Sequence, residues 1–120
     1  MVNLNNGGTV DIDATAAAEL ARRVAGVVLL PGQDGYAQEC AAYNPAVPNT
    51  PVVVVGVAAP SDVQAALVFA SEYNLSVAVM NTGHTTVVAG ERTLLITTRR
   101  LAGVTVDPVT RRARVGAGVR

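Results

Sequence analysis

The fold is decided by the stretch Val77-Ala78-Val79-Met80-Asn81-Thr82-Gly83-His84-Thr85-Thr86, a short apolar run that ends in a polar turn. Val77, Val79 and Met80 are typical of a buried strand. Gly83 permits a positive φ or a close approach of a ligand to the backbone, and His84 is the only histidine of the chain. Such a turn can direct several backbone N–H groups at one anion. The pattern favours a ligand loop at the end of a strand, with a plain connecting loop as the alternative.

A helix is predicted before this strand. Ser61, with Gln64 three residues later, has the pattern of a capping box, and Asp62 suits the positive end of the helix dipole. The helix is expected to run to about residue 74. Its buried stripe is predicted to consist of apolar residues at helical spacing, namely Val63, Ala66, Leu67 and Ala70.

Residues 51–55, a proline followed by four valines, predict a buried strand before that helix. The order strand, helix, strand predicts a βαβ unit with parallel strands. The loop after residue 80 would then leave the carboxyl end of a parallel strand, where open α/β sheets place their ligand sites.

The pattern changes after the loop. Residues 93–98, 104–106 and 113–117 are predicted strands without helix-length gaps between them, and Asp107-Pro108-Val109-Thr110 supplies turn residues for a hairpin between the last two. The predicted fold class is therefore α+β, a βαβ unit followed by an antiparallel hairpin region.

The amino-terminal part, residues 1–26, is predicted to be a polar lead-in followed by a helix capped by Asp13 or Thr15. Residues 27–120 form the second predicted unit. Because the sequence stops in a glycine-rich turn just after a strand, we expect this unit to be a fragment, truncated at its C-terminal end.

Composition excludes several classes of function. The formal net charge is zero, which gives no electrostatic case for nucleic acid. The chain has no lysine, so it cannot contain a Walker-type phosphate loop. Its apolar runs are too short to span a bilayer. No basic segment precedes an apolar one near the amino terminus, so we expect no secretory signal and a cytoplasmic location.

Cysteine and arginine carry little functional signal. Cys40 is the only cysteine, which rules out an internal disulfide, and a buried structural thiol is the expected role. We expect no metal site. A basic cluster near the hairpin is interpreted as solvated charge that discourages edge-to-edge pairing. It consists of Arg99, Arg100, Arg111, Arg112 and Arg114.

Several strings, in this order and spacing, resemble one family, the p-cresol methylhydroxylase and vanillyl-alcohol oxidase type (PCMH-type) of FAD-binding domain. The berberine-bridge-enzyme-like oxidases are the most similar branch. The resemblance covers residues 30–120 and rests on Pro31-Gly32-Gln33-Asp34-Gly35-Tyr36, Ala59-Pro60-Ser61-Asp62-Val63, Thr82-Gly83-His84-Thr85 and Ala113-Arg114-Val115-Gly116-Ala117-Gly118. The third string is similar to the family's Gly-Gly-His-Ser loop, with Thr82 in place of the first glycine.

The resemblance implies that residues 27–120 are part of an FAD-binding domain of an FAD-linked oxidoreductase. It implies cofactor contacts to the pyrophosphate from Met80, Asn81, Thr82, Gly83, His84 and Thr85. In the berberine-bridge branch the loop histidine is bonded covalently to the flavin, which makes His84 the expected attachment residue. No catalytic residue is expected in this segment, and a small-molecule substrate would be bound mainly by a part of the protein beyond residue 120.

Two alternatives compete with this interpretation. The first is an NAD(P)-binding Rossmann-type domain, for which Gly116 and Gly118 would supply the first glycines of the fingerprint. The second is a non-catalytic binding module, or a degenerate remnant that no longer holds flavin.

Overall fold

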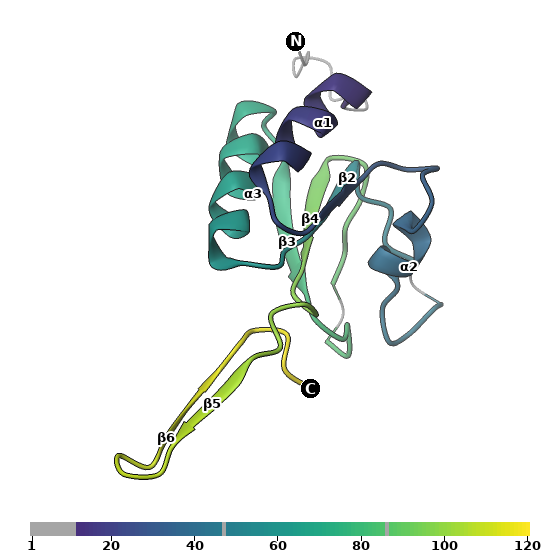
Figure 1. The fold of residues 1–120 in the computed structure, drawn as a ribbon. Helices are drawn as coiled ribbons and strands as arrows, with labels where there is room; N and C mark the ends of the chain where they lie inside the picture. The colour runs from purple at the N-terminus through teal and green to yellow at the C-terminus, as the bar shows by residue number, and fades with distance from the viewer. Residues whose placement is uncertain (1–11, 47, 86) are drawn as a thin grey trace.

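The computed structural model describes residues 12–46, 48–85 and 87–120 of the chain. A four-stranded sheet with helices on both faces forms the body, and a two-stranded hairpin extends away from it (Figure 1). The predicted lead-in lies outside the described residues, except for Ile12, which is buried in the core.

The helices and strands confirm the mixed α+β class. Along the described chain they follow in the order α1 (Ala14–Arg23), β1 (Val27–Leu29), α2 (Tyr36–Cys40), β2 (Val53–Gly56), α3 (Pro60–Glu72), β3 (Ser76–Met80), β4 (Thr93–Thr97), β5 (Val104–Asp107) and β6 (Arg112–Val115).

The sheet has the strand order β1-β2-β4-β3. β2 and β3 are parallel, as predicted, but they are not neighbours, because β4 lies between them and is parallel to both. The prediction that residues 93–98 belong to the antiparallel part was therefore wrong. A helix is not required for a parallel connection, since a crossover of about a dozen residues is long enough, and the irregular segment after β3 provides it. The predicted hairpin is present as the antiparallel pair β5 and β6.

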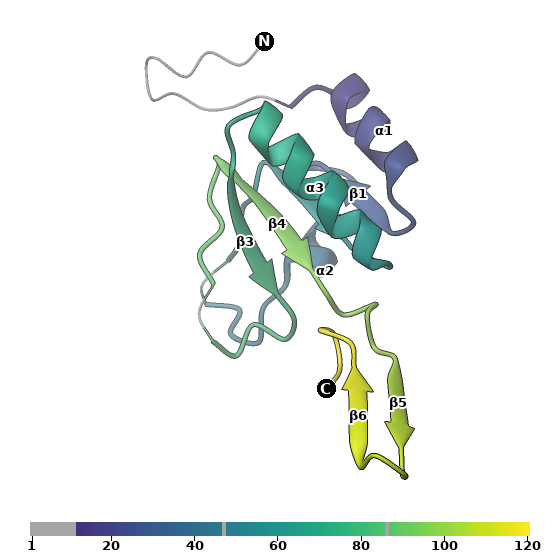
Figure 2. The same ribbon diagram turned by 90° about the vertical axis from the view of Figure 1, so that its left-hand side faces the viewer.

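The two central strands are almost fully buried because helices cover both of their faces, and their residues are apolar apart from Gly56 and the threonines at both ends of β4. On one face, Val53, Val55, Leu94 and Ile96 pack in one cluster with residues of α1 and α3. On the other face, Val54 and Leu95 pack with Cys40 of α2 and with Met80. Figure 2 shows α1 and α3 together on one side of the sheet and α2 behind it. Each fully buried valine or leucine contributes about 1.5–3 kcal/mol, so these strands form the stable centre.

Helix α3 begins at Pro60, with Ala59 as its N-cap, and not at a Ser61 cap as predicted. Asp62 decides this start because its carboxylate accepts hydrogen bonds from the backbone N–H groups of Ala58 and Ala59. It also accepts from Ala25 and Gly26 and so joins the helix start to the segment before β1. Burial acts to raise the pKa of Asp62, but these backbone hydrogen bonds outweigh it and hold the pKa below its usual value.

The exposure of two valines in the edge strand β3 was not predicted. Val77 and Val79 in β3 are 39% and 56% exposed, although a buried strand was expected there. β3 is an edge strand, and these two side chains point to a part of the sheet that α3 does not cover. Leu67 of α3 is also exposed, while Phe69 takes a buried place in the helix stripe.

Candidate functional site

The candidate site begins where β3 ends. β3 and β4 are parallel neighbours, so their carboxyl ends lie at the same edge of the sheet. Met80 is the last residue of β3, and its side chain is buried. The next residues turn outward, from half-buried Asn81 to exposed His84 and Thr85. The structure therefore brings the predicted site residues together in one short loop, which we call the β3 loop (residues 80–85).

Gly83 has a positive φ of 76°, which is one of the two roles expected for it. A Cβ at this position would lie 2.7 Å from the Cβ of Ala42 and 3.1 Å from the Sδ of Met80. The carbonyl oxygen of Thr82 accepts a hydrogen bond of 2.9 Å from the backbone N–H of Tyr43. The β3 loop is thus held closely against the segment that follows α2, and only glycine fits at its bend without strain.

His84 is held by two neighbours although it is exposed. Its Nδ1 atom lies 2.8 Å from the Oγ1 of Thr82. Its ring stacks on Tyr43, with 3.8 Å between ring centroids and an angle of 22° between ring planes. These contacts fix the ring against the loop and against residue 43.

The β3 loop carries hydrogen-bond donors that its own fold does not use. The backbone N–H groups of Thr82, Gly83 and Thr85 have no acceptor among the described residues. The amide nitrogen of Asn81 donates to the carbonyl oxygen of Val119 over 3.1 Å, while its Oδ1 is buried and lacks a partner in the described part of the chain. A turn with several free N–H groups and no charge of its own is suited to an anion such as a phosphate.

A cleft of about 560 Å³ lies beside the loop. Residues 42–45 line one side, and Gly83, His84 and Val87 line the other. It is large enough for part of a ligand, and the exposed ring of His84 borders it.

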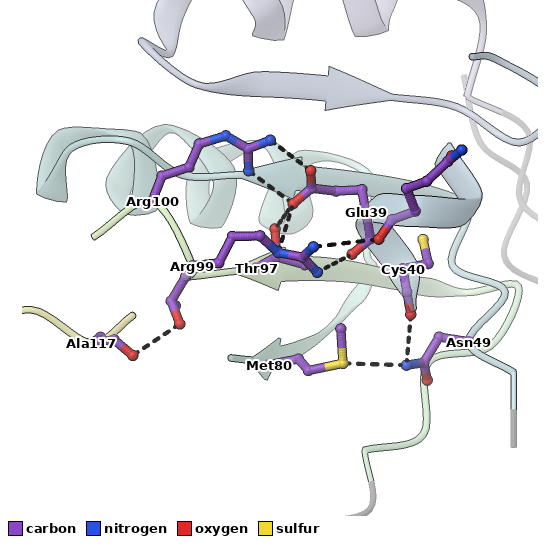
Figure 3. A network of polar contacts seen from close by, with 10 residues as sticks. Glu39, Cys40, Asn49, Met80, Thr97, Arg99, Arg100 and Ala117 are labelled. Atoms are coloured by element: carbon purple, nitrogen blue, oxygen red, sulfur yellow. Dashed lines mark hydrogen bonds and ion pairs between the residues drawn. The ribbon is translucent and has the colours of Figure 1, made fainter. Parts of the chain in front are cut away.

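The end of β4 is built differently (Figure 3). Glu39 of α2 is buried there and accepts two hydrogen bonds from Arg100, of 2.7 and 2.9 Å. The hydroxyl of Thr97 donates to the same carboxylate. Arg99 donates to the carbonyl oxygens of Gln38 and Glu39. The hydrogen bonds from Arg100 are the main cause that lowers the pKa of Glu39.

This network corrects the interpretation of the basic cluster. Arg99 and Arg100 are partly exposed, but both bind α2 and are therefore not free surface charges, whereas Arg111, Arg112 and Arg114 are exposed on the hairpin. The network ties α2 to the end of β4, and α2 in turn leads into Ala42 and Tyr43, which contact the β3 loop. We call Glu39, Thr97, Arg99 and Arg100 the Glu39 network.

Sequence reasoning missed Glu39, Ala42 and Tyr43. Their partners lie some 40 to 60 positions away in the chain, and an alanine or a tyrosine near a short helix gives no local signal of such a contact. Cys40 is buried as predicted, and this burial raises the pKa of its thiol to about 11, which makes it a poor nucleophile.

Gly116 and Gly118 were the glycines expected to begin a fingerprint in the Rossmann alternative. In the structure they pack against the backbone of Leu101 and Thr98, where an added Cβ would clash. They follow a strand of an antiparallel hairpin, whereas a Rossmann fingerprint follows the first strand of a parallel βαβ unit, so the Rossmann alternative is not favoured.

Within residues 12–46, 48–85 and 87–120, no group of three or more histidine, cysteine, aspartate or glutamate side chains is arranged to hold a metal ion. None of the helices described there has the length and apolar character needed to cross a bilayer.

One family model matches the sequence. It describes an FAD binding domain and matches residues 51–120, which include α3, the β3 loop and the hairpin. No curated protein matches the chain.

Solved structures share the fold. 6-Hydroxy-D-nicotine oxidase from Arthrobacter nicotinovorans is 22% identical, with a TM-score of 0.70 over 80% of this chain and 22% of that one. BBE-like 1 from Physcomitrella patens is 20% identical, with a TM-score of 0.73 over 85% and 23%. A carbohydrate oxidase from Microdochium nivale is 22% identical, with a TM-score of 0.71 over 88% and 23%. This chain thus spans less than a quarter of the length of each.

Proposed function

This chain belongs to the FAD binding domain family, and on that premise we propose that it supplies the pyrophosphate-binding part of an FAD-dependent oxidoreductase longer than the chain itself. The family match confirms the resemblance inferred from the sequence. The observation that carries the proposal is the β3 loop, which combines unused backbone donors with a glycine bend at the carboxyl end of a parallel strand.

The β3 loop fits the pyrophosphate of FAD in its chemistry. The loop has no lysine or arginine, so two negative charges would be held by backbone N–H groups, each charge-assisted hydrogen bond contributing about 1.5–3 kcal/mol. The proposed cofactor contacts are Met80, Asn81, Thr82, Gly83, His84 and Thr85.

We further propose that His84 is the flavin attachment residue. Its ring borders the cleft beside the loop, where a covalently attached flavin ring would have to lie. A neutral imidazole has a nitrogen lone pair and is a competent nucleophile. The bond would replace one N–H of the imidazole and one C–H of the flavin, so two electrons and two protons must pass to an acceptor such as dioxygen.

Bound FAD would supply the redox chemistry, accepting two electrons from the substrate. The residues of this chain would bind and orient the cofactor. We assign no catalytic base to them, and we propose that the base and most of the small-molecule site lie in the rest of the full-length protein. The solved structures with this fold include oxidases named for quite different compounds, so they do not favour one substrate.

The test is the flavin content of the purified full-length protein. Gly83→Val should lose most of its FAD, because a branched side chain at a φ of 76° would push the loop away from Ala42. Gly90→Val is the matched control, since nothing lies within 4 Å of a Cβ at that position. A Gly83→Val protein with full flavin content would overturn the assignment of the loop. A wild-type protein that binds no flavin would favour the degenerate-domain alternative.

A further inference from the structure

Tyr43 is an exposed aromatic residue that does not belong to the core. Its side chain is 68% exposed, and it is a member of neither of the two clusters of buried apolar residues that hold the helices to the sheet. Its ring stacks on His84, with 3.8 Å between the ring centroids. Core packing therefore does not account for a large aromatic ring at this position, whereas contact with a residue of the candidate site does.

The backbone that carries this ring is fixed on three sides. The N–H of Tyr43 donates to the carbonyl oxygen of Thr82 over 2.9 Å. The residue before it, Ala42, lies against the bend of the β3 loop. After it, the side-chain oxygen of Asn44 accepts a hydrogen bond from the backbone N–H of Ala46 and so closes a tight turn. The ring is thus mounted on a backbone that is itself tied to the β3 loop.

We propose that Tyr43 is a positioning residue for flavin attachment, because it holds the ring of His84 in one orientation at the edge of the cleft. The inference rests on the proposed function and deepens it, since it adds to the β3 loop a residue from a separate segment that sets how fast the flavin is attached. Both residues line the same cleft of about 560 Å³, so the stack borders the space proposed for the flavin ring.

The stack acts by limiting the rotamers of His84. An exposed histidine on a loop ordinarily samples several side-chain rotamers, and a reaction of its ring proceeds only from the productive one. In this chain one face of the imidazole is covered, since the two ring planes differ by only 22°. Tyr43 therefore restricts the ring before the cofactor enters the cleft. This restriction affects the rate of attachment, whereas the backbone N–H groups of the loop are responsible for holding the phosphates.

Tyr43 takes no part in the bond changes themselves. In the attachment step, one N–H of the imidazole and one C–H of the flavin give way to the new bond, and two electrons and two protons pass to dioxygen. The phenol ring contributes only the orientation of its neighbour. A phenylalanine at position 43 should therefore serve as well as the tyrosine.

The stack can be measured without flavin, because His84 is the only histidine of the chain. In proton NMR spectra, a proton that lies over the face of an aromatic ring is shifted upfield. We expect upfield shifts for the carbon-bound imidazole protons of His84 in the wild type and in Tyr43→Phe, and ordinary shifts in Tyr43→Ala. Ordinary shifts in the wild type would overturn the proposal.

The rate of attachment is measured on the full-length protein, purified without flavin and then mixed with FAD in air. The fluorescence of the acid-precipitated pellet is followed over time. Tyr43→Phe should attach flavin at the wild-type rate. Tyr43→Ala should be about 3- to 10-fold slower, the factor that corresponds to one aromatic stack, with the same total of bound FAD. Val88→Ala is the matched control, since it truncates a side chain that is 77% exposed shortly after the β3 loop, and it should match the wild type.

Equal attachment rates in the wild type and Tyr43→Ala would contradict this inference alone and leave the proposed function intact. A loss of bound FAD from Tyr43→Ala would also contradict it, because Tyr43 would then be a binding residue. If Tyr43→Phe were as slow as Tyr43→Ala, the hydroxyl would be the active group and the stack would not. A wild type that binds FAD without attaching it would overturn the proposed attachment at His84 and this inference with it.

Discussion

The ends of β3 and β4 lie side by side at one edge of the sheet, yet they are built in opposite ways. At the end of β4, the Glu39 network contains the charges, and its members bind one another. At the end of β3, the loop is uncharged and leaves several backbone donors without an acceptor in the described chain. The charged end of β4 connects α2 to the sheet, and the neutral end of β3 is the candidate site.

This difference shows that charge is a poor guide to the site in this protein. A buried carboxylate between two arginines satisfies its own hydrogen-bonding needs and has little left for a ligand. Unused backbone N–H groups at a bend that requires glycine are a better sign, because they remain free to donate to a bound anion. The following predictions test whether the two ends differ in this way.

The largest effect on stability is expected at the β4 end. Glu39→Gln removes the charge that binds Arg99 and Arg100. Because these arginines are about a third exposed, water will compensate in part, and we expect a loss of about 2–3 kcal/mol in the free energy of unfolding. Urea denaturation measures it. Glu19→Gln, which removes the exposed ion pair with Arg22, is the control and should cost less than about 0.5 kcal/mol. Equal losses of unfolding free energy in the two variants would show that the Glu39 network does not stabilise the contact between α2 and β4.

The Glu39 network should also make the free energy of unfolding depend on pH. The pKa of Glu39 is lowered by folding, so its contribution is fully present above its unfolded pKa, near 4.5, and is lost as the pH falls through the folded pKa. The wild type should therefore lose its advantage over Glu39→Gln as the pH is lowered from 6 toward the folded pKa of Glu39. Urea midpoints at a series of pH values test this, and a constant difference between the two proteins would count against it. Asp62, whose pKa is also lowered, should leave a residual slope in both.

A smaller effect is expected at the bend of the β3 loop. Gly83→Ala places a side chain at a φ of 76° and close to Ala42, which should destabilise the chain by about 1–2 kcal/mol. Gly90→Ala, at an open position, should stay within about 0.5 kcal/mol of the wild type. If both substitutions behaved alike in urea denaturation, the close contact between the loop and Ala42 would be absent in solution.

The smallest effect on stability is expected from His84→Ala. The substitution removes an exposed ring and its stack on Tyr43, so the free energy of unfolding should fall by less than about 1 kcal/mol. Thermal or urea unfolding of this variant beside Glu39→Gln gives the comparison directly. A loss as large as that of Glu39→Gln would mean that His84 has a structural role.

Local patterns predicted most elements of this fold, and long-range contacts explain what they did not. The valine run of β2, the hairpin and the glycine bend at Gly83 follow from neighbouring residues. The insertion of β4 between β2 and β3 could not be predicted, because its apolar sequence fits any central strand. The exposure of Val77 and Val79 depends on how far α3 extends over the sheet. The role of Glu39 depends on arginines some 60 residues away.

The candidate site was predictable only in part. The loop and His84 stand out in the sequence, since a polar glycine turn follows an apolar strand. Their supports, Ala42 and Tyr43, come from a separate segment that gives no local signal. The contact between Thr82 and His84 is local, but its geometry depends on the turn and was visible only in the structure.

The central claim is that the uncharged β3 loop binds FAD and that His84 is its point of attachment. The most direct test is the mass of the denatured full-length protein, together with the flavin fluorescence of its acid-precipitated pellet, for the wild type and for His84→Ala. We predict that the wild type carries the added mass of one FAD and keeps fluorescence in the pellet, and that His84→Ala releases all flavin to the supernatant. Release of all flavin from the wild type, or its retention by the His84→Ala pellet, would contradict the claim.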